Sequence, residues 1–147
     1  MTSHRCSYCD AYPLKATGRY EIDHFRPKTR EEFYELVCTW DNLFLICTAC
    51  NGAKRDQWEP PLLRPDDEGY AFERYFLFNF ETGELQPAPD IPPPDRHRAR
   101  RTIEILDLNR ADACKTRLST IKAIRRRESD DELADLGHRF LVPLVAS

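Results

Sequence analysis

Two pairs of cysteines with C-x-x-C spacing constrain this chain more than any other feature of its sequence. The pairs are Cys6 with Cys9 and Cys47 with Cys50. Two residues between thiolates allow a tight turn to aim both sulfur atoms at one metal ion, and two such turns supply the four soft ligands of a tetrahedral zinc site. The alternatives are a redox dithiol, which requires only one pair, or ordinary buried cysteines. We therefore predict a structural zinc ion.

The remaining cysteines and the start of the chain point away from disulfide chemistry. Cys38 and Cys114 belong to no paired motif, so we expect both in the hydrophobic core. The polar N-terminus leads directly into the first cysteine pair, without the apolar stretch of an export signal. Cysteines of a chain without such a signal serve metal binding or packing more often than disulfides. We expect a cytoplasmic protein.

The segment between the pairs is longer than in a simple zinc ribbon and carries a second set of polar residues. Residues 10–46 separate the pairs, whereas a ribbon places about 12 to 20 residues there. Asp23 directly precedes His24, and neutral imidazole is available near pH 7 to act as a general base. Neighbouring side chains of an extended strand point to opposite faces. A bend before Pro27 is therefore needed to bring both groups to one metal ion.

A series of motifs completes this pattern in order. C-x-x-C, D-H-x-x-P, N-L and C-x-x-C-N-x-x-K follow one another across residues 6–54. The series resembles the HNH endonucleases, which have a zinc-knuckle frame and a ββα-metal fold. The resemblance implies that His24 is the base, that Asp23 and Asn51 hold a catalytic Mg²⁺ or Mn²⁺, and that Asn42 fixes the loop carrying the base. Many family members have His at the position of Asn51. Glu21 either supports this site or is a strand surface residue.

Four basic residues near these motifs are candidates for contacting a nucleic-acid backbone: Arg26, Lys28, Lys54 and Arg55. The resemblance implies cleavage that leaves a 5′-phosphate and a 3′-hydroxyl. DNA is the leading substrate, and RNA is the alternative because hydrolysis depends on backbone chemistry. A competing hypothesis is a zinc-framed module that binds nucleic acid or protein on a degenerate HNH fold.

Two later segments extend the resemblance. Residues 60–65 and 102–109 are similar to those of HNH proteins of the Septu/retron type, the PtuB-like group. That group implies a role in anti-phage defence together with an ABC/AAA-type ATPase partner.

The sequence predicts an α+β protein in three parts. Residues 1–58 form the nuclease core, with a short helix over residues 30–36 and a strand over residues 40–46. Residues 59–95 are a proline-bounded connector with an aromatic β-hairpin around residues 70–80. Residues 96–147 are a basic helical region: two helices with apolar stripes, then a third from a capping box at residues 129–132 to about Phe140. No apolar run is long enough to cross a membrane.

The net charge of −3 conceals a strong asymmetry along the chain. Residues 96–127 contain 11 Lys and Arg against three acidic residues, whereas the rest of the chain is strongly acidic. These basic residues are either solvated helix surface or part of one basic face. Such a face would bind nucleic acid or dock the ATPase partner.

Overall fold

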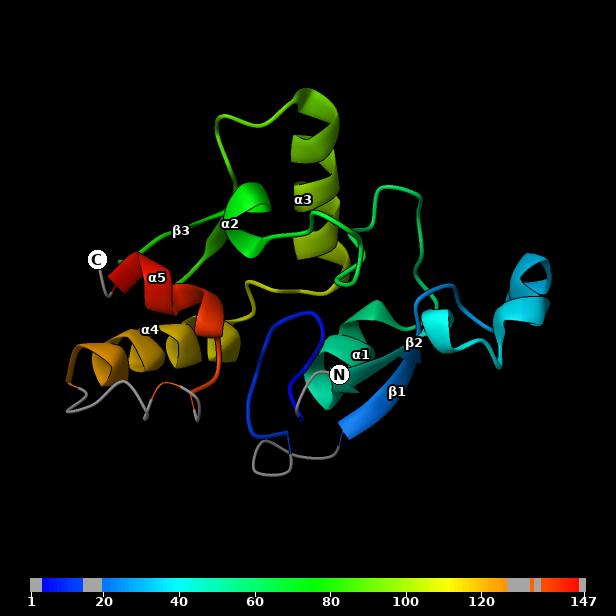
Figure 1. Cartoon of the computed structure of the whole chain (residues 1–147), viewed down its shortest axis with the longest axis horizontal. Helices are drawn as coiled ribbons and strands as arrows, with labels where there is room; N and C mark the ends of the chain where they lie inside the picture. Colours follow the sequence, from blue (N-terminus) through cyan, green and yellow to red (C-terminus); the bar gives the residue numbers. More distant parts are fainter. Residues whose placement is uncertain (1–3, 15–19, 127–132, 134–135, 146–147) are drawn as a thin grey trace.

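The structure is a computed structural model that describes residues 4–14, 20–126, 133 and 136–145. The strands lie in the first two thirds of the chain with short helices between them, and they form two separate two-stranded sheets. Figure 1 shows the first sheet and helix α1 toward the right, helix α4 on the left, and helix α3 at the top between them. The predicted α+β class is confirmed.

The N-terminal part is an antiparallel pair of strands followed by a short helix. β1 (Tyr20–His24) pairs with β2 (Leu43–Cys47), and α1 (Thr48–Lys54) packs against both strands. Cys47 caps the helix, because its Sγ accepts a hydrogen bond from the backbone N–H of Cys50 at 3.5 Å. The second cysteine pair therefore lies in the turn that joins strand to helix.

The register of this sheet decides which side chains face α1. Glu21 lies opposite Ile46, and Asp23 lies opposite Phe44. Directly opposed residues of an antiparallel pair share one face of the sheet. Ile46 and Phe44 are buried on that face. Two carboxylates of β1 are thus placed beside the core and the helix.

The connection between β1 and β2 contains two short 3-10 helices. The first, Glu31–Leu36, matches the predicted helix and buries Phe33, but Leu36 is only half-buried. The second, Trp40–Asn42, replaces the start of the predicted strand, which begins only at Leu43. Trp40 projects into solvent instead of pairing in the sheet.

The aromatic segment forms a hairpin that is shorter than predicted. Phe72–Tyr75 makes one helical turn, α2, and only then do β3 (Phe76–Phe78) and β4 (Leu85–Pro87) pair. Phe76 and Phe78 are buried, so both rings pack inside the fold. The expectation of a strand over residues 72–75 was wrong, because this turn stacks Phe72 on Phe140 instead of extending the ladder.

The turn of this hairpin packs closely on the helical region. Gly83 has a φ of 77°, and a Cβ there would overlap the backbone carbonyl of Cys114. The buried Arg117 donates a hydrogen bond to the Gly83 carbonyl at 2.6 Å. This glycine therefore allows the hairpin to approach the helix that carries Cys114 and Arg117.

Two helices make up most of the C-terminal part. α3 (Pro93–Ile105) and α4 (Ala111–Arg126) are separated by a short break that contains Asn109. The Asn109 side chain accepts a hydrogen bond from the backbone N–H of Leu85 at 2.8 Å and donates one to its carbonyl at 2.9 Å. This pair of bonds joins the break between the helices to strand β4.

The end of the chain differs from the predicted third helix. Its capping box at residues 129–132 lies outside the described residues. Residues 136–138 are not helical, and the chain then forms a 3-10 turn, Arg139–Leu141, followed by α5 (Val142–Val145). His138 has a φ of 54°, a left-handed conformation that prevents a continuous helix.

One hydrophobic cluster connects all three parts of the chain. It includes Ile46 next to α1, Phe78 of the hairpin and Ile124 of α4. A smaller cluster joins Leu63 and the hairpin to α3. Among the described helices, none combines the length and the apolar character that crossing a bilayer requires.

Candidate metal centre and active site

The two cysteine pairs meet in one buried cluster. The Sγ atoms of Cys6, Cys9, Cys47 and Cys50 all lie within 4.8 Å of one another. Cys9 Sγ is 3.8 Å from Cys47 Sγ. A tetrahedral site with zinc–sulfur bonds of about 2.3 Å requires sulfur–sulfur separations of about 3.8 Å. The four thiols therefore fit a metal ion such as zinc.

The thiols also show the electrostatic signature of crowded ligands. Hydrogen bonding from Cys50 lowers the pKa of Cys47. Hydrogen bonding with Cys47 raises the pKa values of Cys9 and Cys50 well above the usual range. Four thiols at this spacing cannot all ionise without a cation, and a bound metal ion removes this conflict.

The two remaining cysteines have different environments. Cys114 is buried in α4, as predicted, and its Sγ contacts the Asn109 carbonyl at 3.4 Å. Cys38 is exposed, so its predicted core position was wrong. It lies in the irregular connection just after the first 3-10 helix, which runs over the surface.

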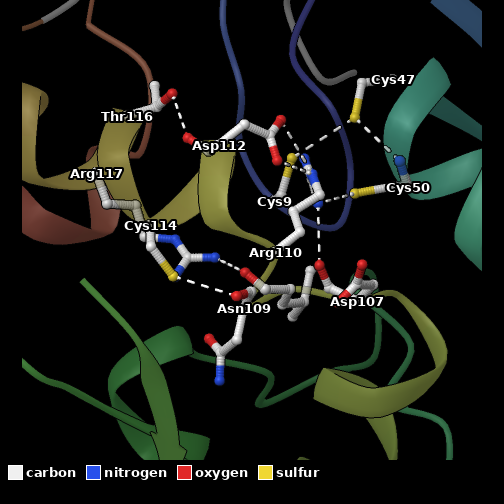
Figure 2. A network of polar contacts seen from close by, with 11 residues as sticks. Cys9, Cys47, Cys50, Asp107, Asn109, Arg110, Asp112, Cys114, Thr116 and Arg117 are labelled. Atoms are coloured by element: carbon white, nitrogen blue, oxygen red, sulfur yellow. Dashed lines mark hydrogen bonds and ion pairs between the residues drawn. The ribbon is translucent and has the colours of Figure 1, made fainter. Parts of the chain in front are cut away.

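An arginine of the helical region lies beside the cysteine cluster. Arg110 Nη1 is 3.7 Å from Cys50 Sγ, and Figure 2 shows its guanidinium between the cysteine sulfur atoms and Asp112. Burial alone would lower the pKa of Arg110, but the neighbouring cysteine sulfurs raise it above its usual value. The guanidinium thus compensates part of the negative charge of the ligands.

The end of the chain covers the first cysteine turn. The buried His138 ring contacts the Cys9 carbonyl through Nδ1 at 2.7 Å, and burial lowers the pKa of His138 to about 4. The backbone N–H of His138 also donates to the Asp10 carbonyl at 2.9 Å. Arg139 pairs with the Asp10 carboxylate at 2.9 Å. No motif in the sequence indicates this contact.

A polar pocket of about 470 Å³ lies between the end of β1 and α1. Its lining combines carboxylates, an imidazole, an amide and basic side chains, including Glu21, Asp23, His24, Lys28, Asn51 and Arg55. The structure thus brings together most of the residues that the motifs single out. Most of the lining residues have polar or charged side chains, which suits a charged ligand.

Asp23 is buried at the inner side of this pocket. Its Oδ1 pairs with Lys54 Nζ at 2.9 Å, and its Oδ2 accepts a hydrogen bond from the Tyr8 hydroxyl at 2.8 Å. Lys54 Nζ also donates to the His24 carbonyl at 2.8 Å. Lys54 is completely buried, so the predicted phosphate contact of this lysine does not match the structure. Its position three residues after Asn51 turns it toward β1, not toward solvent.

Asn51 contacts Glu21 across the pocket. The Asn51 Nδ2 donates a short hydrogen bond to Glu21 Oε2. Because only the amide nitrogen can donate to a carboxylate, this contact directs the amide oxygen away from Glu21. The sequence left open whether Glu21 supports the site or is a strand surface residue, and the structure places it at the site. Alternation along β1 was the available signal, since residues 21 and 23 share one face.

His24 lies on the opposite side of the strand from Asp23, as alternation requires. β1 stays regular through His24, which pairs with Leu43, so the structure shows no bend before this residue. The His24 Nε2 lies 3.0 Å from the Val37 carbonyl. Because a carbonyl oxygen only accepts, Nε2 is the donor in this contact, and Nδ1 is the ring nitrogen that can accept.

Asn42 joins the segments on either side of the connection. Its Oδ1 accepts a hydrogen bond from the backbone N–H of Arg26 at 2.8 Å. Its Nδ2 donates to the carbonyls of Arg26 at 3.0 Å and Leu36 at 3.2 Å. The buried Asn42 amide therefore fixes the chain immediately after His24.

Three of the four basic residues proposed for phosphate contact are exposed. Lys28 and Arg55 line the pocket. Arg26 is exposed next to it, with its guanidinium 5.7 Å from the Phe33 ring centre and 5.5 Å from that of Trp58. Together they leave positive charge at the pocket entrance.

The basic helical region divides into paired and exposed side chains. Arg101 pairs with Glu59 at 2.7 Å, Arg98 lies 3.6 Å from Asp67, and Arg117 is buried. A second group is exposed: Arg100, Lys115, Lys122, Arg125 and Arg126. Neither a fully solvated surface nor a single basic face describes the whole segment, because several of its arginines are buried or form ion pairs within the fold.

Comparison with known proteins supports the sequence resemblance. Residues 6–57 match the family model described as HNH endonuclease. The chain is 26% identical to the Septu protein PtuB of Bacillus thuringiensis over 76% of this chain and 39% of that protein. It is also 26% identical to the Septu protein PtuB of Bacillus mycoides (strain KBAB4), over 93% of this chain and 48% of that protein. The chain thus spans less than half the length of these relatives.

Proposed function

From the HNH endonuclease match of residues 6–57, we propose that this chain is a metal-dependent endonuclease that hydrolyses phosphodiester bonds of nucleic acid. The observation that carries the proposal is the pocket itself. It holds an imidazole whose Nε2 donates to the Val37 carbonyl, which makes Nδ1 the accepting nitrogen, near an oriented amide and two carboxylates. These are the groups that a phosphodiester hydrolase needs.

His24 acts as the general base. The hydrogen bond from Nε2 to the Val37 carbonyl fixes the ring, so Nδ1 accepts the proton of the attacking water. Lys54 and Asn42 hold the backbone at and just after this residue, through the His24 carbonyl and the Arg26 peptide groups. The base is thereby positioned before substrate binds.

Asp23 and Asn51 would hold one hard divalent cation, with magnesium as the default and manganese as the alternative. Their carboxylate and amide oxygens are the donors that such ions prefer. The cation supplies charge stabilisation at the phosphate and the leaving oxygen. Glu21 supports this arrangement, because its contact with Asn51 Nδ2 leaves the amide oxygen available.

Arg26, Lys28 and Arg55 bind the phosphate backbone next to the pocket, whereas the buried Lys54 is a structural counter-ion. DNA is the first substrate to test and RNA the alternative, because none of these groups distinguishes the two sugars. The expected products carry a 5′-phosphate and a 3′-hydroxyl, as the family resemblance implies.

Cleavage of supercoiled plasmid and end-labelled single-stranded DNA and RNA tests this proposal. The zinc-loaded chain should cut with Mg²⁺ or Mn²⁺ and stop cutting when EDTA removes the cation. His24→Ala should lower the rate at least about 100-fold, since it removes the base, and should retain zinc. His97→Ala is the matched control, because His97 is exposed on α3 and remote from the pocket lining.

Absence of cleavage of every substrate with both cations, also in the presence of a partner, would contradict the nuclease assignment. Nucleic-acid or protein binding that is unchanged in His24→Ala would then favour the zinc-framed binding module.

The similarity to Septu protein PtuB extends the proposal to a partner. We propose that the chain acts with an ABC/AAA-type ATPase in anti-phage defence. The exposed basic side chains of α4 and the adjoining helical region are the candidate docking surface. Affinity purification from the native host should recover such an ATPase, and a gene for one should neighbour this gene. Recovery of the chain without any ATPase would contradict this part.

A further inference from the structure

A direct hydrogen bond connects the zinc-binding turn to the pocket. Tyr8 lies between the two cysteines of the first pair, and its hydroxyl donates to Asp23 Oδ2 at 2.8 Å. The contact joins residues 15 positions apart and is fully buried. When Cys6 and Cys9 bind one metal ion, the backbone of Tyr8 between them is also fixed, and with it the starting point of the side chain that reaches Asp23.

The Tyr8 ring is held firmly for this task. Its ring centre lies 6.0 Å from that of Phe44, the residue opposite Asp23 in the sheet. The hydroxyl lies 2.8 Å from Asp23 Oδ2, and Tyr8 is the donor in this contact because a carboxylate oxygen accepts. A protonated, packed tyrosine beside a carboxylate is a donor of fixed direction.

Asp23 retains the capacity to bind a cation despite its two partners. A carboxylate offers about four lone-pair positions on its two oxygens. Lys54 and Tyr8 each occupy one, on different oxygens. They restrain the carboxylate in a single orientation and leave one position on each oxygen. A ligand that is already oriented loses less conformational freedom when the cation binds.

We propose that Tyr8 is a positioning residue, which holds Asp23 for the divalent cation and so couples the zinc-binding turn to the active site. The inference rests on the proposed function in that it takes Asp23 as a ligand of that cation. It assigns to the first cysteine turn a role beyond framing the fold.

Tyr8→Phe is the appropriate variant, because it removes the hydroxyl and keeps the ring. Mn²⁺ binding to the zinc-loaded chain, measured by electron paramagnetic resonance without nucleic acid, should weaken about tenfold. Zinc content should remain that of the unmodified chain. Tyr20→Phe is the matched control, since Tyr20 lies half-exposed on β1 and outside the pocket lining, and its Mn²⁺ affinity should not change. Asn51→Ala identifies which Mn²⁺ signal belongs to the pocket.

Cleavage kinetics separate positioning from general damage. Tyr8→Phe should need about tenfold more Mn²⁺ for half-maximal cleavage and should regain the unmodified rate at saturating Mn²⁺. Unchanged Mn²⁺ affinity with retained zinc, or a rate that does not recover at saturating Mn²⁺, would overturn the inference.

The failure of this inference differs from the failure of the proposed function. If the unmodified chain cuts and Tyr8→Phe binds Mn²⁺ equally well, the nuclease stands and the role of Tyr8 falls. If the chain does not cut but Tyr8→Phe weakens Mn²⁺ binding, the role of Tyr8 stands and the nuclease assignment falls. If no Mn²⁺ signal responds to Asn51→Ala, the pocket cation and the role of Tyr8 are overturned, and the cleavage assay alone decides whether the chain is a nuclease.

Discussion

The cysteine cluster and the polar pocket share helix α1, but they are assembled differently. Each cysteine pair is a local turn, and the four ligands are of one residue type. The pocket depends on contacts across the chain: Asn51 reaches Glu21 over 30 positions and Lys54 reaches Asp23 over 31. Local spacing therefore specifies each half of the first site, and the two halves meet across 38 positions. The second site has no such local half and requires the finished ββα unit.

The two sites also balance their charge in different ways. The cysteine cluster needs a cation from solution, with Arg110 as a partial substitute beside it. The carboxylate of the pocket already has an internal cation, the buried Lys54. The three changes below test this contrast by removing a ligand, the internal cation and the adjacent arginine.

Cys50→Ser should have the largest effect. It removes one ligand from a site whose metal contributes on the order of 10 kcal/mol to small zinc domains. We expect loss of bound zinc and of the cooperative unfolding transition, measured by metal analysis and circular dichroism. Cys114→Ser is the control, because Cys114 is equally a buried cysteine but lies outside the cluster. A Cys50→Ser chain that keeps its zinc and its transition would refute the four-cysteine centre.

Lys54→Met should rank second. It leaves the Asp23 carboxylate buried without its counter-ion, which costs about 3–5 kcal/mol of unfolding free energy. Urea unfolding followed by fluorescence measures this loss. Arg55→Met, one residue further along and exposed, should change stability by less than about 0.5 kcal/mol. Equal stability of the two variants would show that the pair is not a structural element of the pocket.

Arg110→Gln should have the smallest effect of the three. Loss of the guanidinium beside Cys50 should accelerate zinc transfer to a chelator about tenfold. Arg110→Lys should restore part of the retention, because it keeps the charge, and Arg100→Gln, on the exposed side of α3, should release zinc like the unmodified chain. The same rate for Arg110→Gln and Arg100→Gln would limit the metal centre to its four cysteines.

The contrast between the sites also explains what sequence reasoning achieved. The cysteine spacing and the strand that leads into Cys47 were predicted from short-range patterns, and the ββα arrangement from the resemblance to the HNH endonucleases. The direction of the Lys54 side chain was not predicted. Helical spacing places Lys54 near Asn51, but it does not determine which element this face of the helix contacts. Only the packing of α1 on β1 buries this lysine.

The basic region was the least predictable for the same reason. Charge counting treats Arg110 and Arg117 like the exposed Arg126, although both turn inward. Arg117 is buried because the Gly83 and Leu108 carbonyls accept its hydrogen bonds, and the fold alone brings those carbonyls together. The helical turn at residues 72–75 is a similar case, since an aromatic run suits a strand until Phe140 offers a stacking partner.

The contact between His138 and the Cys9 carbonyl has a consequence for how the chain folds. It closes a separation of 129 residues, so it contributes strongly to contact order. During synthesis every pocket residue leaves the ribosome well before residue 138 does. The zinc-binding turn can therefore form early, but the contact of His138 that covers it forms only after residue 138 has been synthesised.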